Sequence, residues 1–349
     1  MKAIGKRSFA RSALEVSELG MGSAPLGGLY RPVTTADATE ALQAAWDLGV
    51  RYFDSAPMYG LGRCEHLVGT LLRGKEEETG RQDWVLSSKV GRLLRNPRPG
   101  APLPPPLPRN KYDSGWQSGL SFTEVFDYSY DGVMRSYEDS QQRLGLPRID
   151  ILYVHDIGRA THGERHDKQW NDLVTGGFKA LGELRAGGYI KAVGLGVNEW
   201  QSIREALDVF DLDCCLLAGR YTLLDQSALP DLLAACTARQ VSVVMAGVFN
   251  SGILVSGGDQ KFNYIDAPAE ILEHVARLKA LCDRFEVPLA AAALQFPLAH
   301  PAAASVVVGA RSAAEIRQAA AWFRQPIPAE FWSALHESGL IDAAAPLPA

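Results

Sequence analysis

From about residue 19 onward, short apolar runs alternate with longer segments in which apolar residues recur every three or four positions. The short runs predict buried strands, and the periodic segments predict amphipathic helices. The predicted strands are Leu19–Gly22, Tyr52–Asp54, Val85–Lys89, Ile149–His155, Ile190–Gly196, Cys214–Ala218, Val241–Ala246 and Ser305–Val308. The predicted helices are Ala38–Leu48, Glu65–Arg73, one beginning at Asp131, Phe178–Ala186, Ser202–Val209, Pro230–Arg239, Ala269–Arg284 and Ala313–Trp322. This alternation indicates repeated βα units around a parallel sheet.

Eight such repeats, closed on themselves, predict an α/β fold of the TIM (β/α)8 barrel type. The main alternative is an open, doubly wound sheet with a Rossmann dinucleotide site. That site needs the spacing GxGxxG directly after an early strand, and Gly20, Gly22, Gly27 and Gly28 do not provide it. We therefore expect a single barrel domain over residues 1–349, with its active site at the carboxyl ends of the strands.

Two segments fall outside the repeats. Ser8–Leu14 and Val16–Glu18 predict a hairpin with a tight connection before the first repeat. After the third strand comes a long insertion, residues 92–122, whose proline-rich part excludes helix and central strand and whose tail carries Trp116 and Phe122. Long loops in compact domains are often functional, so we expect a lid over the substrate; a mobile surface loop is the alternative.

Composition narrows the class of partner and the compartment. The net charge of -5 is spread without a basic block, which argues against nucleic acid or an anionic membrane as partner. No stretch approaches the roughly 20 apolar residues that span a bilayer, and the first 20 residues lack the apolar core of a signal peptide. Five cysteines without metal-ligand spacing fit reduced thiols. We expect a soluble, cytoplasmic protein of unknown oligomeric state.

Four polar residues stand at the predicted carboxyl ends of the second, third and fourth strands. They are Asp54, Tyr59 just after it, Lys89 and His155. Each type also occurs at such positions for structural reasons, as a cap, a turn former or a solvated end. The barrel rule for strand ends nevertheless makes the four candidates for a common catalytic site.

Together the four residues supply a coherent mechanism for hydride transfer. Reduction of a carbonyl needs a proton donor for the developing alkoxide, and the reverse reaction needs a base. Tyr59 suits both roles, and a nearby ammonium on Lys89 is expected to lower its pKa. Asp54 pairs with Lys89, while His155 donates a hydrogen bond that polarises the substrate oxygen.

From about Arg7 to Ala320, the chain resembles the aldo-keto reductase superfamily. Residues 53–69, FDSAPMYGLGRCEHLVG, are similar to the family pattern FDTAxxYG…SExxxG, with Cys64 in place of the usual small hydroxyl residue. The segments LSSKVG and LYVHD follow in the family's order. The resemblance implies that Tyr59 is the general acid and base, with Asp54, Lys89 and His155 as its partners.

The resemblance also implies an NAD or NADP cofactor that lies across the barrel mouth without a Rossmann motif. Gly22 and Asn198 are candidate contacts, and Trp116 joins Tyr59 and His155 as a candidate substrate contact. The chain departs from the family pattern at two strands. Ala218 stands where a Gln is usual, and MAGVFNSGIL replaces a segment that usually carries an aromatic residue stacked on nicotinamide.

The turn after the last strand is a candidate phosphate site, because such turns present backbone N–H groups and a helix N-terminus. A simple βα turn is the alternative. Its candidate cofactor contacts are Gly309, Ala310, Arg311, Ser312 and Glu315. The resemblance implies that this turn meets the adenosine 2′ position. Arg311 suits a 2′-phosphate, but Glu315 stands where the family frequently has Arg, which favours NAD, with dual use expected.

Within the superfamily, the long insertion with VGLGVNEW and LAGRYTLLDQ is similar to bacterial aldose 1-dehydrogenases and to pyridoxal 4-dehydrogenases. The resemblance implies oxidation of a hemiacetal to a lactone. The leading expectation is an aldose of the L-fucose, D-arabinose or L-galactose type, oxidised at C1 with Tyr59 as base. Pyridoxal oxidation, general aldehyde or ketone reduction, and a cofactor-binding regulatory subunit are the alternatives.

A metal site is not expected. His162, Glu164 and His166 in THGERHD superficially resemble a zinc motif, but HGERH is not HExxH and has no evident third ligand. A solvated polar loop is the expected structure there.

Overall fold

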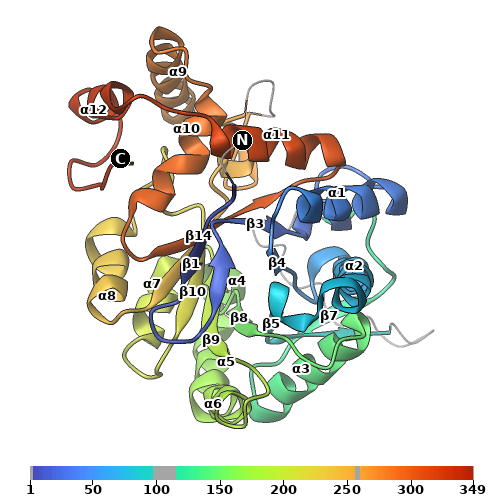
Figure 1. The fold of residues 1–349 in the computed structure, drawn as a ribbon. Helices are drawn as coiled ribbons and strands as arrows, with labels where there is room; N and C mark the ends of the chain where they lie inside the picture. The colour runs from blue at the N-terminus through green and yellow to red at the C-terminus, as the bar shows by residue number, and fades with distance from the viewer. Residues whose placement is uncertain (1–2, 97–114, 256–259, 349) are drawn as a thin grey trace.

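A closed barrel of eight parallel strands forms the centre of the computed structural model, which describes residues 3–96, 115–255 and 260–348 (Figure 1). Each strand pairs with the next one in the barrel, and β14 closes the ring onto β3. The strands are β3 (Leu19–Gly22), β4 (Tyr52–Asp54), β5 (Val85–Val90), β8 (Ile151–His155), β9 (Ala192–Val197), β10 (Cys214–Ala218), β11 (Ser242–Ala246) and β14 (Ala303–Gly309). The expected barrel is confirmed, and the doubly wound alternative is wrong.

Helices surround the barrel, and their polar N-caps show why several of them begin where they do. Thr34, Ser129 and Ser312 each accept a hydrogen bond from a backbone N–H in the first turn. The helices are α1 (Thr35–Asp47), α2 (Arg63–Thr79), α3 (Tyr130–Leu144), α4 (Arg159–His162), α5 (His166–Asp172), α6 (Phe178–Ala186), α7 (Trp200–Ala206), α8 (Ala234–Ala238), α9 (Ala269–Arg284), α10 (Leu289–Gln295), α11 (Ala313–Arg324) and α12 (Ala329–Glu337). All eight predicted helices are present; α6 and α9 have the predicted bounds, and the others have shifted ends.

The N-terminal hairpin closes the amino end of the barrel. It consists of β1 (Lys6–Ser8) and β2 (Glu15–Ser17), which pair antiparallel. Phe9, Leu14 and Val16 are buried against side chains from the first residues of several barrel strands, including Tyr52. The expected hairpin is therefore present, but its expected bounds are wrong, because residues 9–14 form a wide connection that fills the barrel end.

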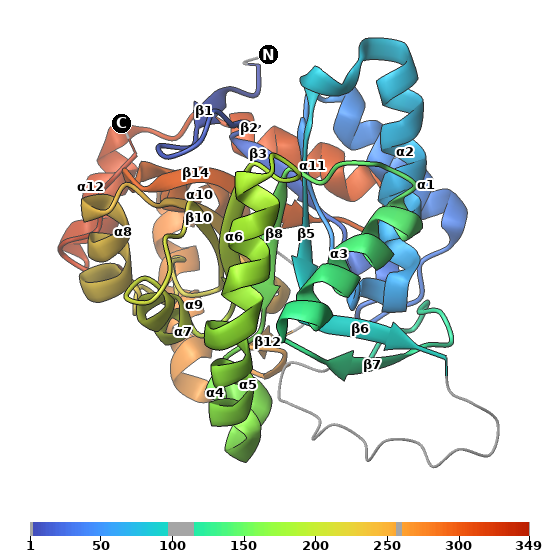
Figure 2. The ribbon, with the colours of Figure 1, turned by 90° about the horizontal axis from the view of Figure 1, so that it is seen from below.

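The insertion after β5 contains a second hairpin, at the opposite end of the molecule from the first (Figure 2). β6 (Arg92–Arg95) and β7 (Thr123–Phe126) pair antiparallel, so the ends of the insertion are folded together. Trp116 forms a β-bridge with Leu29. The proline-rich part expected to act as a lid lies in residues 97–114, outside the described residues. A third short hairpin, β12 (Lys261–Phe262) and β13 (Ile265–Asp266), follows β11.

No helix within the described ranges is long and apolar enough to cross a membrane.

Candidate active site

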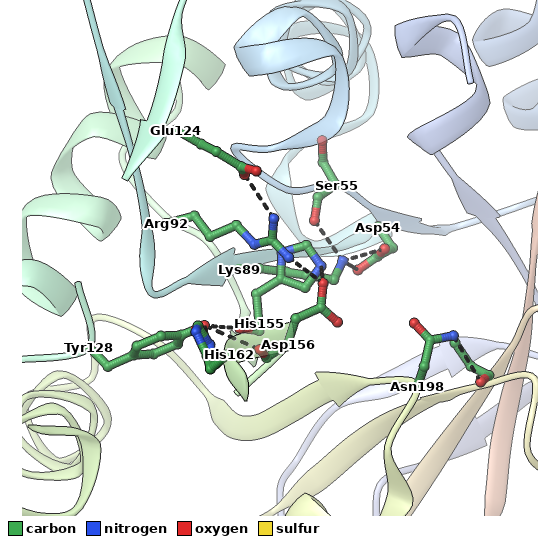
Figure 3. Close-up of polar contacts among 11 residues, drawn as sticks. Asp54, Ser55, Lys89, Arg92, Glu124, Tyr128, His155, Asp156, His162 and Asn198 are labelled. Atoms are coloured by element: carbon green, nitrogen blue, oxygen red, sulfur yellow. Dashed lines mark hydrogen bonds and ion pairs between the residues drawn. The ribbon is translucent and has the colours of Figure 1, made fainter. Parts of the chain in front are cut away.

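Asp54, Tyr59, Lys89 and His155 lie at the carboxyl end of the barrel, as the sequence predicts. Asp54 and His155 are the last residues of β4 and β8, and Lys89 is near the end of β5. Tyr59 begins the short 3-10 helix Tyr59–Gly62 that follows β4. Because neighbouring parallel strands end at the same rim, side chains that are far apart in sequence meet there. Figure 3 shows Asp54, Lys89 and His155 gathered at this rim.

A buried ion pair forms the base of the site. Lys89 Nζ lies 2.8 and 2.7 Å from the two carboxylate oxygens of Asp54 and donates a third hydrogen bond, of 2.9 Å, to the backbone oxygen of Ser55. Ser87 Oγ donates to Asp54 Oδ1 at 2.7 Å. The side chains of Lys89 and Asp54 are only 1% and 4% exposed, so water scarcely screens the pair. All three donors of the ammonium are satisfied, which fixes its position.

The phenol of Tyr59 lies against this ion pair and against His155. Lys89 Nζ is 4.7 Å from the centre of the Tyr59 ring, and the His155 ring meets Tyr59 edge-on with 5.8 Å between ring centres. Burial, followed by the carboxylates of Asp54 and Asp156, raises the pKa of Tyr59 well above its usual value of 10. The expectation of a lowered pKa is wrong, because burial and the two carboxylates together raise it.

His155 is held as a neutral imidazole. Burial and the positive charges of Arg92 and Lys89 lower its pKa well below 6.5. Its backbone oxygen accepts a 2.6 Å hydrogen bond from Tyr128, which anchors the end of β8. The ring Nδ1 is buried and has no hydrogen-bond partner in the described structure. A neutral imidazole has one N–H to donate, as a group that polarises a substrate oxygen requires.

A cleft of about 620 Å³, open to solvent, lies above these residues. Tyr59, Lys89 and His155 line it together with Trp116 and Asn198, so the candidate substrate contacts share one space. The rings of Trp116 and Tyr59 are tilted by 50° with their centres 5.8 Å apart. Trp116 therefore packs beside the Tyr59 phenol, although most of the insertion that carries it lies outside the described residues.

Among the cleft residues that were not identified from the sequence, two have polar side chains. Asp156 follows His155 directly, and Tyr264 comes from the β12–β13 hairpin. Tyr264 and the preceding Asn263 both have positive φ, 67° and 50°, as the two-residue turn of a tight hairpin requires. An Asn at the first turn position is the one sequence feature that favours this hairpin.

Asp156 belongs to a chain of charges that extends away from the cleft. Arg92 on β6 donates to Asp156 Oδ2 with one nitrogen and to Glu124 on β7 with another, at 2.8 Å (Figure 3). The guanidinium also lies 4.6 Å from the centre of the Phe126 ring. The β6–β7 hairpin thus delivers both Arg92 and Glu124 to the site.

Comparison with known proteins assigns the family. The profile of the Aldo/keto reductase family matches residues 18–339. A pyridoxal 4-dehydrogenase from Microbacterium luteolum is 60% identical over 98% of this chain and 99% of its own length. The chain belongs to the aldo/keto reductase family. It is an oxidoreductase of a family that uses nicotinamide nucleotides.

Two more similarities fit the same family. A D-threo-aldose 1-dehydrogenase from a Pseudomonas species is 39% identical over 95% of this aldo-keto reductase and 97% of its own length. Among solved structures, a holo aldo-keto reductase from Bacillus halodurans has a TM-score of 0.72 and 23% identity, with 98% of both chains covered. This second similarity supports the fold.

The candidate nicotinamide contacts of the reductase lie beside Asp54, Tyr59, Lys89 and His155, the tetrad of candidate catalytic residues. Asn198 and Ala218 line the cleft, and the Asn198 amide donates a 3.2 Å hydrogen bond to the Ala218 backbone oxygen. Gly22 ends β3, and a Cβ there would lie 2.9 Å from a Val307 methyl group. Asn198 therefore lies in the wall of the cleft, where a cofactor contact was expected. The absence of a side chain at Gly22 lets β3 lie close to β14.

The turn after β14 forms as expected, but its residues do not line the cleft around Tyr59. A Cβ on Gly309 would lie 2.4 Å from Pro25 Cγ, so glycine is required for this close approach. Ala310 is buried, and Ser312 caps α11 by accepting from the Glu315 backbone N–H at 3.3 Å. The Glu315 carboxylate accepts a 2.7 Å hydrogen bond from the Arg311 backbone N–H and pairs with its guanidinium at 3.1 Å.

The loop after β11 turns tightly. Gly247, Asn250, Ser251 and Gly252 all have positive φ, and the backbone N–H groups of Asn250 and Gly252 donate to the Gly247 and Phe249 oxygens within the loop. Asn250 is 4% exposed, and its Oδ1 has no hydrogen-bond partner in the described structure. The Phe249 ring packs on Trp322 with 6.1 Å between centres.

The THGERHD segment is not the solvated loop that we expected. His162 ends α4 and His166 begins α5, and both are buried. The His162 ring packs edge-on against Phe126, and its Nε2 lies 3.1 Å from the Tyr128 hydroxyl. No group of three His, Cys, Asp or Glu residues within the described parts of the chain is arranged to hold a metal ion.

Proposed function

We propose that this aldo-keto reductase oxidises the cyclic hemiacetal of pyridoxal to a lactone with NAD. The observation that carries the proposal is the 60% identity, over nearly the whole length of both chains, to a protein named pyridoxal 4-dehydrogenase. The sequence alone ranked aldoses first and pyridoxal second. The comparison favours the reverse order, since the aldose dehydrogenase is 39% identical.

The cleft supports a flat aromatic substrate. Trp116, Tyr59 and Tyr264 line it, together with the apolar side chains of Leu29 and Met58. Aromatic rings prefer offset or tilted contacts with one another, and each such pair contributes about 0.5–1.5 kcal/mol beyond the area it buries. A pyridine ring gains these contacts, whereas a sugar ring does not.

The chemistry follows from the charges of the tetrad. A bound oxidised nicotinamide supplies the hydride acceptor and a positive charge. Tyr59 removes the proton of the hemiacetal hydroxyl, Lys89 stabilises the phenolate that this requires, and Asp54 holds Lys89 in place. His155, neutral because its pKa is lowered, donates to the substrate oxygen. Because its pKa is raised, Tyr59 is protonated in the resting enzyme. The protonated phenol is the form that reduction in the reverse direction needs.

The preference for NAD is supported by the pairing of Arg311. Glu315 occupies both its guanidinium and its backbone N–H, which are the groups that a 2′-phosphate would use. A carboxylate in this place repels a phosphate and suits a free ribose hydroxyl.

A second candidate is oxidation of an aldose at C1. The observations that favour it are the 39% identical D-threo-aldose 1-dehydrogenase and the polar groups of Asp156 and Asn198 in the cleft wall. Several hydroxyl groups of a sugar would need such partners, because an unpaired polar group in a closed site costs binding energy.

The test is formation of reduced nucleotide with pyridoxal, L-fucose, D-arabinose and L-galactose, each with NAD and with NADP. We expect pyridoxal with NAD to give the highest kcat/KM, and the Tyr59→Phe variant to lose about 10²- to 10⁴-fold in kcat on every substrate. Higher kcat/KM on a sugar would favour the second candidate. No turnover of pyridoxal would refute the proposal.

A further inference from the structure

Arg92 holds the carboxylate of Asp156 from behind, on the side away from the cleft. The Arg92 side chain is 5% exposed and does not line the cleft, whereas Asp156 is 15% exposed and does. Glu124 takes the other arm of the same guanidinium at 2.8 Å. The arrangement presents one negative group to the cleft and balances its charge inside the protein.

The backbone of Asp156 is fixed in an uncommon conformation. Its φ is 45°, in the left-handed region that Asp and Asn tolerate better than most residues. Its backbone N–H donates to the Gly196 oxygen at 3.2 Å, which ties the end of β8 to β9. Backbone strain of this kind persists where the surrounding structure enforces it, and it clusters at functional sites.

One oxygen of the Asp156 carboxylate remains available. Both contacts that the described structure gives this carboxylate use Oδ2: the hydrogen bond from Arg92, and His155 Nε2 at 3.5 Å. Figure 3 shows the other oxygen turned away from the Arg92 guanidinium. Oδ1 is therefore an acceptor with negative charge at the edge of the cleft, beside the imidazole that meets the substrate oxygen.

We propose that Asp156 is a specificity-determining residue: it accepts a hydrogen bond from a second hydroxyl group of the substrate, next to the oxygen that reacts. The reacting oxygen lies between Tyr59 and His155. Since Asp156 Oδ2 is 3.5 Å from His155 Nε2, a hydroxyl about one hydrogen-bond length from the reacting oxygen reaches this carboxylate. Pyridoxal has its phenolic hydroxyl in that position, and an aldose has its C2 hydroxyl.

Because the Asp156 acceptor is charged, it should discriminate strongly between substrates with and without the second hydroxyl group. A hydrogen bond to a charged group contributes more than one between neutral groups, and a substrate without the donor leaves Oδ1 of the Asp156 carboxylate without a hydrogen-bond partner in a closed site. Burial raises the pKa of Asp156, and the guanidinium of Arg92 opposes that rise and orients the carboxylate. The charge of Arg92 also helps to lower the pKa of His155. Arg92 acts through Asp156 and is thus a positioning residue. The choice of pyridoxal rests on the proposed function, whereas the selection for a second hydroxyl does not.

The test compares two ligands that differ in one donor, 2-hydroxybenzyl alcohol and 2-methoxybenzyl alcohol. Their dissociation constants are measured by calorimetry on the enzyme saturated with NADH, so that no turnover is needed. We expect the hydroxyl compound to bind about 10- to 100-fold more tightly, the range for a hydrogen bond to a charged group. In Asp156→Asn, Arg92 holds the amide oxygen and turns the NH2 group toward the cleft. This variant should bind the two ligands within about threefold of each other.

The matched control is Asp83→Asn. Asp83 pairs with Arg51 at 2.8 Å and precedes β5, at the opposite end of the barrel. This variant also converts a carboxylate of an arginine pair to an amide, and it should keep the full wild-type discrimination. Equal binding of the two alcohols by the wild type, binding of neither, or undiminished discrimination in Asp156→Asn would overturn the inference. Discrimination without pyridoxal turnover would refute only the proposed substrate.

Discussion

Removing the ammonium of Lys89 should destabilise the whole barrel, in addition to abolishing activity. In Lys89→Met, the Asp54 carboxylate keeps a single side-chain hydrogen bond, from Ser87, and remains 4% exposed. At 2.7 Å and an effective dielectric constant of about 20, the lost attraction is about 6 kcal/mol. Part of this is offset because Lys89 no longer has to be desolvated. Breaking a buried pair by removing one partner costs about 3–5 kcal/mol, and we expect that loss in the free energy of unfolding.

A double-mutant cycle separates the charge effect from the loss of packing. Asp54→Asn alone should also cost about 3–5 kcal/mol, since it leaves the ammonium without its counter-ion. The double variant Asp54→Asn/Lys89→Met has no uncompensated charge, so it should recover most of the stability lost by either single variant. All three variants should lack turnover with pyridoxal and with simple aldehydes.

Denaturant unfolding, followed by fluorescence and by circular dichroism, measures these differences. The reasoning is refuted if Lys89→Met loses less than about 1 kcal/mol, the usual value of a solvent-exposed pair. It is also refuted if the double variant is less stable than both single variants. Either result would mean that water reaches the pair.

Three further outcomes are expected. Tyr59→Phe should reduce kcat by about 10²- to 10⁴-fold in both directions, with little change in the unfolding midpoint. Because the pKa of Tyr59 is raised above 10, its phenolate fraction increases tenfold per pH unit through neutrality. In pH titrations, kcat/KM for oxidation should rise with that slope, while reduction, which uses the protonated form, should be flat; a flat oxidation profile contradicts this. Glu315→Gln releases Arg311 and should tighten NADP binding, relative to NAD, by about two- to fivefold, with unchanged NADP affinity as the contrary result.

Local sequence patterns were enough to predict the barrel and the grouping of the tetrad residues at one end of it. A local apolar run predicts each strand. Because the strands are parallel, polar residues at their carboxyl ends all lie at the same end of the barrel. Asp54 and Lys89 are 35 residues apart, yet the barrel rule alone places them together. The four tetrad residues do not distinguish pyridoxal from aldose oxidation, because the proposed mechanism uses them in the same way for either substrate.

The surroundings of the tetrad could not be predicted in the same way. Arg92 and Asp156 are separated by 64 residues, and their contact depends on the pairing of β6 with β7 across a long insertion. No local periodicity encodes such pairing. The pKa of Tyr59 was predicted in the wrong direction because it depends on burial and on two carboxylates, of which only Asp54 had been identified.

The hairpin at the amino end closes that end of the barrel, whereas the cleft opens at the other end. Phe9, Leu14 and Val16 fill the amino end, and above them a hydrogen-bonded column runs from Tyr52 through Ser87 to Asp54. A proton taken up by Tyr59 during oxidation therefore returns to bulk water through the same mouth that admits the substrate. Proton release is consequently tied to the departure of whatever occupies that mouth, and it should follow product release in time.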